Sequence, residues 1–272
     1  MRWPWLAIGA LIPLSAAWPS TEISAKSDGG DGHALVRKAL DRAAWNEEQD
    51  FASRSRSRMT KNVRRFDKHG EVTEEDDGDY EVVPIDRVPF ERRLTIHDRP
   101  LSDEERGWED EREMEFREAL RRSRESGDEP EREEEIVFNE ELLARYTFTL
   151  EGEAQLRGRA SYRVSFQPRA GHLPAPRAID HALNKARGTI WIDRETYEAA
   201  RIEFELTDKV RLWWGLLGTI RRARGSRDRG PVLDETWATI QYETYTDTRV
   251  IFKSTRRAEY RQWRDFEWVE AP

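Results

Sequence analysis

The chain has 272 residues, contains no cysteine and carries a formal net charge of −8. Because it is acidic, nucleic acid is a poor partner for it, and without cysteine it has neither disulfides nor a lipid-modified N-terminal cysteine. The hydrophobic and charged fractions are equal at 37%, which indicates a folded core with a large solvated surface. These figures favour one large domain or two small ones, stabilised by packing alone.

The first residues have the features of a cleavable signal peptide. Arg2 provides a positive charge, residues 6–14 form a short apolar stretch, and residues 15–17 are small, as a signal peptidase requires. The apolar stretch is too short, and too broken by prolines, to span a bilayer of roughly 30 Å. We therefore expect export to the periplasm. The expected organisation is a signal peptide (1–17), a flexible linker (18–32) and a single domain (33–272).

The first part of this domain is predicted to contain a helix followed by polar strands. Residues 33–46 have apolar side chains at helical spacing, with Asp31 as the N-cap. Residues 50–66 alternate but are polar on both faces, which favours a strand at a sheet edge, and residues 67–70 form a turn. Residues 80–97 are a further extended stretch, interrupted by prolines.

Residues 101–135 are highly charged, with 16 acidic and 7 basic side chains. Ser102 followed by Glu105 is a helix-start signature, and acidic and basic residues recur three and four positions apart, as on a solvated helix. We therefore expect a long charged helical insertion. The pattern leaves open whether this helix lies against the sheet or projects from it.

From residue 144 the pattern is that of an antiparallel meander, because strands follow one another through short turns. Alternating apolar and polar side chains predict strands at 145–150, 161–166, 188–193, 200–206, 235–252 and 256–268. The expected connections are turns at 151–153 and 194–196, a loop or short helix at 170–187 and a large basic loop at 207–234. The predicted fold class is α+β, mainly antiparallel β.

Three runs of this meander resemble the outer-membrane lipoprotein-sorting family, which includes the LolA and LolB carriers. They are YRVSFQP at 162–168, GTIWID at 188–193 and ARIE at 200–203. The resemblance implies an unclosed half β-barrel whose concave face is covered by helices and encloses an apolar cavity for acyl chains. The charged insertion and the large basic loop depart from the family pattern, and no family binding residue matches a position here.

If the resemblance holds, the cavity is lined by the apolar side chains on one face of three strands. These ligand-cavity candidates are Tyr162, Val164, Phe166, Ile190, Ile192, Ile202, Phe204 and Leu206. A second apolar group, flanked by arginines, suits either a lid that touches lipid headgroups or a plug that closes one end of the half-barrel. These mouth or lid candidates are Trp213, Trp214, Leu216 and Leu217.

The sequence offers no catalytic or metal-binding constellation. None of the five histidines has the spacing of a ligand pair, and there is neither a nucleophile elbow nor a phosphate-binding loop. Asp193 is expected to bond the backbone of its turn rather than to act as an acid or base.

Two functions therefore remain, neither of them enzymatic and neither with a cofactor. The first is a periplasmic carrier-like protein that binds an acyl chain, a lipid or a lipoprotein and transiently contacts a membrane surface. The alternative is an envelope sensor or protein-interaction module with the same fold, in which the charged helix docks a partner.

Overall fold

The computed structural model describes residues 31–49, 51–126, 140–171, 173–212, 218–234, 236–250 and 253–269. Its helices are α1 (Gly32–Glu48), α2 (Asp103–Ser126), α3 (Glu140–Arg145) and α4 (Ala178–Leu183), with a 3-10 turn, η1, at Phe51–Ser53. Its strands are β1 (Ser55–Phe66), β2 (Val72–Ile85), β3 (Val88–Arg93), β4 (Thr95–Ile96), β5 (Arg99–Pro100), β6 (Tyr146–Leu156), β7 (Arg159–Pro168), β8 (Ala186–Asp193), β9 (Ala199–Leu206), β10 (Val210–Leu212), β11 (Gly218–Leu233), β12 (Thr236–Val250) and β13 (Lys253–Trp268). The expected signal peptide lies outside the described residues.

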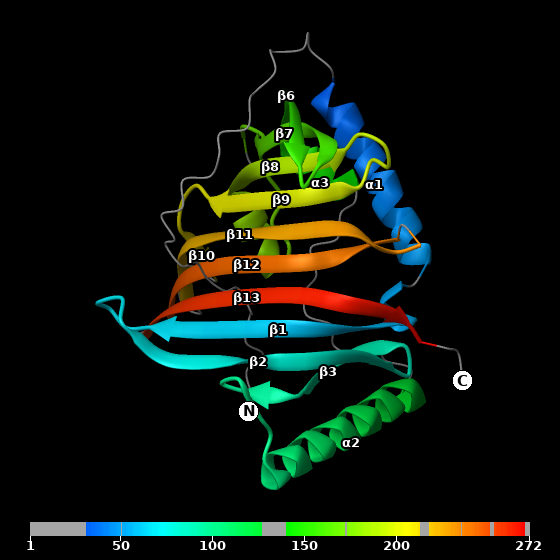
Figure 1. Ribbon diagram of the computed structural model, residues 1–272. Coiled ribbons are helices and arrows are strands. Elements are labelled where there is room, and N and C mark those ends of the chain that lie inside the picture. The colour runs from blue at the N-terminus through cyan, green and yellow to red at the C-terminus, as the bar shows by residue number, and fades with distance from the viewer. Residues whose placement is uncertain are drawn as a thin grey trace.

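One antiparallel sheet of eleven strands dominates the molecule (Figure 1). Its order is β3-β2-β1-β13-β12-β11-β9-β8-β7-β6, with β10 added beside β11, and β4 and β5 form a separate small pair. The terminal strands β3 and β6 do not pair with each other, so the sheet stays open, as expected for an unclosed half-barrel. The predicted fold class, α+β and mainly antiparallel, is confirmed.

Helix α1 lies across only one end of the sheet, on its concave face. The Asp31 carboxylate accepts a hydrogen bond from the His33 N–H at 3.0 Å, as an N-cap does. The apolar side of the helix packs onto β6–β9, and this contact forms the largest buried cluster: Val36, Ala39, Leu40, Leu143, Val164, Ile190 and Ile192. The helix predicted at 33–46 is therefore correct, but it covers one half of the concave face instead of the whole.

The strand expected at a sheet edge lies inside the sheet. β1 pairs with β2 on one side and with β13 on the other. Its polar side chains on both faces misled the prediction, because here the concave face is itself polar over these strands. The stretch 80–97 is not one extended segment either. It turns back at Asp86 and Arg87, whose φ angles of 51° and 70° form a hairpin turn without glycine.

Two predicted connections belong to strands. Most of the basic segment 207–234 is β11, a long strand between β9 and β12; its arginine-rich and glycine-rich sequence hides the alternation that marks a strand. The turn expected at 151–153 is a bulge inside β6, where the register with β7 shifts between Leu150 and Gly152. The β6–β7 turn instead falls at Arg157 and Gly158, both with positive φ.

The charged insertion forms helix α2, which ends the described part of that segment at Ser126. Ser102 and Glu105 make the reciprocal capping contacts that the sequence predicts, at 3.2 and 2.8 Å. Phe116 and Leu120 pack against apolar residues of the β2–β3 hairpin, so α2 lies against the sheet, along its β3 end (Figure 1).

Candidate functional site: the two halves of the concave face

Rows of directly opposed residues show that the concave face has an apolar half and a polar half. Opposed residues of paired strands point to the same face. One row runs Val164, Ile190, Ile202, Arg227, Tyr242, Arg261 and Lys61 from β7 to β1. It changes from aliphatic to charged at β11, so the boundary between the halves lies between β9 and β11.

The apolar half contains the ligand-cavity candidates. Val164, Ile190 and Ile192 are at most 2% exposed and are packed against α1. Tyr162, Phe166 and Ile202 are partly buried around the same cluster. The expected side chains thus share one face, and α1 side chains cover its centre in this structure.

The two remaining candidates lie toward the boundary. Leu206 packs against a smaller cluster made of Val210, Ile220 and Ala223. Phe204 lies between Gly188 of β8 and Gly225 of β11, its opposed residues. The absence of a Cβ at both glycines leaves space for the Phe204 and Phe166 rings to cover the sheet.

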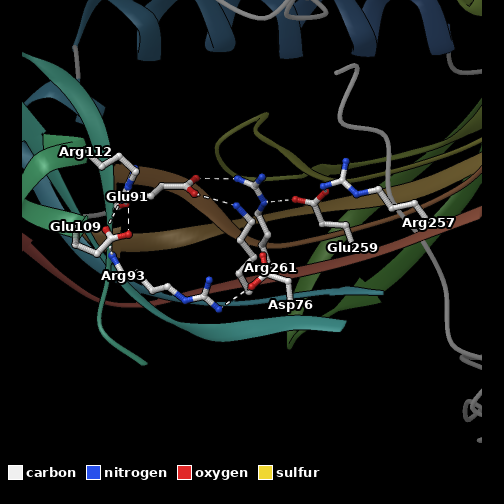
Figure 2. A network of polar contacts seen from close by, with 9 residues as sticks. Asp76, Glu91, Arg93, Glu109, Arg112, Arg257, Glu259 and Arg261 are labelled. Carbon is white, nitrogen blue, oxygen red and sulfur yellow. Dashed lines mark hydrogen bonds and ion pairs between the residues drawn. The ribbon is translucent and has the colours of Figure 1, made fainter. Parts of the chain in front are cut away.

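The polar half is organised around a fully buried carboxylate, that of Glu259, which is 1% exposed. It lies between Arg257 at 2.9 Å and Arg261 at 2.5 Å, and Arg261 also contacts Glu91 at 2.8 Å (Figure 2). Lys61 of β1 reaches the other oxygen of Glu91 at 3.2 Å. We call these five residues the charged ladder.

The charged ladder is held together electrostatically but is incompletely hydrogen-bonded. Burial favours the neutral form of Arg261, but Glu91 and Glu259 outweigh this effect and raise the pKa of its guanidinium. Among the described residues, Arg257 Nε and Glu259 Oε2 are buried and have no hydrogen-bond partner. Glu259 Oε2 still has the Arg257 guanidinium at 2.9 Å as its ion-pair partner, so the unmatched group here is the Arg257 Nε donor.

A second buried carboxylate fastens α1 to the sheet. Glu198, which is 0% exposed, accepts hydrogen bonds from Arg42 at 2.8 Å and Asn46 at 2.7 Å, both on α1. Its other oxygen accepts one from Arg229 of β11 at 2.6 Å. One carboxylate in the β8–β9 turn therefore adds a polar anchor to the apolar packing that holds α1 over the apolar half.

Asp193, in the same turn, has the structural role expected of it. One of its oxygens accepts hydrogen bonds from the N–H groups of Glu195 and Thr196 at 3.1 and 2.9 Å, and Arg159 pairs with the other at 2.6 Å. Burial of this carboxyl favours its neutral form, but these hydrogen bonds prevail and lower its pKa. It is a turn residue that accepts hydrogen bonds at both carboxylate oxygens.

The mouth or lid candidates Trp213, Trp214, Leu216 and Leu217 lie outside the described residues. Among the described residues, a hollow of about 290 Å³ is lined by His181, Lys185, Asp208, Lys209, Val210 and Arg211. It is basic and opens beside β10. Within the part of the chain that the structure describes, no group of three metal-ligating side chains forms and no helix is long and apolar enough to cross a membrane.

Sequence reasoning missed the charged ladder, although it left a signal. Arg257, Glu259 and Arg261 are spaced two apart in a predicted strand, so they had to share one face. The strand pattern alone does not tell whether this face points to the inside or the outside of the sheet.

The comparisons with known proteins give matches to solved structures alone. No family model and no curated protein matches the chain. Among solved structures, a DUF1329 family protein from Desulfovibrio piger is similar at 13% identity and a TM-score of 0.32, over 88% of this chain and 95% of the other.

Two further structures belong to the lipoprotein-sorting group. A putative outer membrane lipoprotein-sorting protein domain from Vibrio parahaemolyticus matches at 11% identity and a TM-score of 0.30, over 87% of this chain and 94% of the other. A LolA superfamily protein from Nitrosomonas europaea matches at 12% and 0.29, over 89% and 96%. At these identities and TM-scores the likeness is reported as a similarity and carries no conclusion about this chain.

Proposed function

We propose that the protein is a periplasmic carrier-like binding protein that shelters the acyl chain of a lipid or lipoprotein. The observation that supports this most is the division of the concave face. One half is a continuous apolar floor under an amphipathic helix, and the other half carries charges. An amphiphile, with an apolar chain and a polar head, matches such a surface.

The binding site we propose is the space between α1 and the floor of β7–β9. Burying an acyl chain stabilises a complex by about 0.8 kcal/mol per CH₂ group. Because α1 now covers Val164, Ile190 and Ile192, a chain reaches them as α1 moves outward and its apolar contacts are exchanged for those of the ligand. The polar head then lies toward the charged ladder. The N-terminal pattern of charge, apolar stretch and small residues supports export.

The test is native mass spectrometry, with lipid extraction, on the mature protein purified from periplasm. The matched variants are Phe204→Glu, which places a charge on the apolar floor, and Glu205→Gln, the neighbouring exposed residue on the opposite face. We expect an acylated molecule to co-purify with the wild type and with Glu205→Gln, and to be lost from Phe204→Glu.

Two outcomes would contradict the proposal. One is a wild-type protein that carries no lipid and takes up neither added fatty acid nor lipopeptide. The other is a folded Phe204→Glu variant, verified by circular dichroism, that binds the same molecule as well as the wild type does.

A further inference from the structure

The free edge of β3 is covered by side chains of α2. β3 ends the strand order of the described residues, and no strand among them pairs with its outward backbone groups. The N–H of Arg93 donates a hydrogen bond to the Glu109 carboxylate at 3.0 Å, and Arg112 donates one to the C=O of Glu91 (Figure 2). Edge strands left open invite pairing with other chains, and here a helix occupies that position.

The apolar part of the contact between α2 and the edge is small. Of the α2 side chains, Phe116 and Leu120 join the apolar cluster around Ile85 and Phe90, while Trp108 and Met114 are 59% and 63% exposed. A small apolar contact is inexpensive to open.

The helix also has its own sources of stability, independent of the sheet. Its capping contacts at Ser102, three acidic residues in its first turn and the Arg117–Glu113 ion pair at 2.7 Å are all internal. The helix can therefore remain folded when it separates from the β3 edge.

The residues that α2 presents to β3 show what would replace it. Phe116 covers Phe90 with ring centroids 5.1 Å apart, and Asp110 and Glu113 pair with Arg92. Phe90 and Arg92 point to the same face of β3, since they are two residues apart. A strand added to this edge would match Phe90 with an apolar residue and Arg92 with a carboxylate, two positions apart in the added strand.

We propose that the β3 edge is a strand-addition site for an extended segment of a partner protein, with α2 as its reversible cover. The segment carries an apolar side chain opposite Phe90 and a carboxylate opposite Arg92, and its backbone pairs with Glu91 and Arg93. This site lies at the opposite end of the sheet from the acyl-binding half, and neither requires the other.

The test measures binding of a dye-labelled peptide, Thr-Glu-Thr-Leu-Thr-Val, to the mature chain by fluorescence anisotropy. Phe116→Asp with Leu120→Asp releases α2, and Met114→Asp on the exposed side of the same helix is the control. We expect the release variant to bind at least tenfold more tightly than the wild type and Met114→Asp, because α2 no longer competes. A peptide with Lys in place of Glu should not bind.

Equal affinity of the wild type and the release variant, or equal binding of the Lys peptide, would overturn the proposal. Hydrogen exchange adds a direct readout: the Arg93 amide should exchange faster in the release variant and regain protection with peptide. If β1 and β13 also lose protection, the release variant has disturbed the whole sheet. The double variant Glu109→Ala with Arg112→Ala is then the test, since it removes the hydrogen bonds to the β3 backbone and keeps the apolar contact. Threefold tighter binding then supports the site, and unchanged binding refutes it.

Discussion

Three buried carboxylates show how the same chemical group serves different ends according to its partners. Asp193 accepts hydrogen bonds at both oxygens, from Arg159 and from backbone N–H groups, and closes a turn. Glu198 collects donors from α1 and β11 and so joins two elements. Glu259 pairs with two arginines of its own strand, one at each oxygen, and so holds three neighbouring charges on one face.

Asp193 provides a prediction about pH. Its pKa is lower in the folded protein than the ordinary 3.8, so its ionised form stabilises the fold above the unfolded pKa, and this contribution is lost as pH falls through the folded pKa. Asp193→Asn should lower the free energy of unfolding by about 1–3 kcal/mol at pH 7, and the difference from the wild type should shrink below pH of about 4. Urea titrations between pH 7 and pH 2.5 measure this.

The control for that prediction lies two residues away. Glu195 also contacts Arg159, but its side chain is 82% exposed, so Glu195→Gln should change stability by less than about 1 kcal/mol at every pH. A constant deficit of Asp193→Asn from pH 7 to pH 2.5 would show that the loss comes from packing and not from the charge.

At the scale of elements, a glycine in a strand and a glycine in a helix of this chain differ in what surrounds them. A Cβ on Gly188 of β8 would lie 1.8 Å from the Glu203 carbonyl oxygen and 2.7 Å from the Phe166 ring. A Cβ on Gly107 of α2 would have nothing within 4 Å. The first glycine is required by close packing, whereas the second only weakens its helix.

Alanine substitutions at these two positions should therefore act in opposite directions. Gly188→Ala should destabilise the protein by about 1–3 kcal/mol, because backbone and rings must shift. Gly107→Ala should stabilise α2 by about 0.5–1 kcal/mol. Thermal unfolding followed by circular dichroism distinguishes them, and an unchanged melting temperature for Gly188→Ala would disprove the packing argument.

At the scale of the whole molecule, the polar half of the concave face is unusual because it buries ion pairs where apolar side chains are expected. Buried ion pairs contribute little net stability compared with apolar residues of similar volume, although breaking one leaves an uncompensated charge. The charged ladder is therefore expected to add little to the net stability of the fold, although the loss of one member should be costly.

This view predicts the stability of two ladder variants. Glu259→Ala alone should cost about 3–5 kcal/mol, since Arg257 and Arg261 lose their shared counter-charge. The triple variant Arg257→Met, Glu259→Leu and Arg261→Met should be as stable as the wild type, or more so. Denaturant midpoints give the comparison. A triple variant less stable than Glu259→Ala would mean that the ladder is needed for the fold itself.

The local elements were largely readable from the sequence, because they depend on neighbours in the chain. The cap at Asp31, the helix start at Ser102 and the alternation in β7, β8 and β9 are such signals. β11 escaped because its arginines and glycines interrupt the alternation of apolar and polar residues, and the Asp86–Arg87 turn escaped because it lacks glycine.

What only the tertiary structure decided is which surfaces meet. Alternation places Arg257, Glu259 and Arg261 on one face, but the position of β13 between β1 and β12 turns that face inward. The charges of α2 predict a helix, but β3 as the last strand in the order determines that it covers an edge. Pairing order joins residues far apart in the chain, and no local pattern records it.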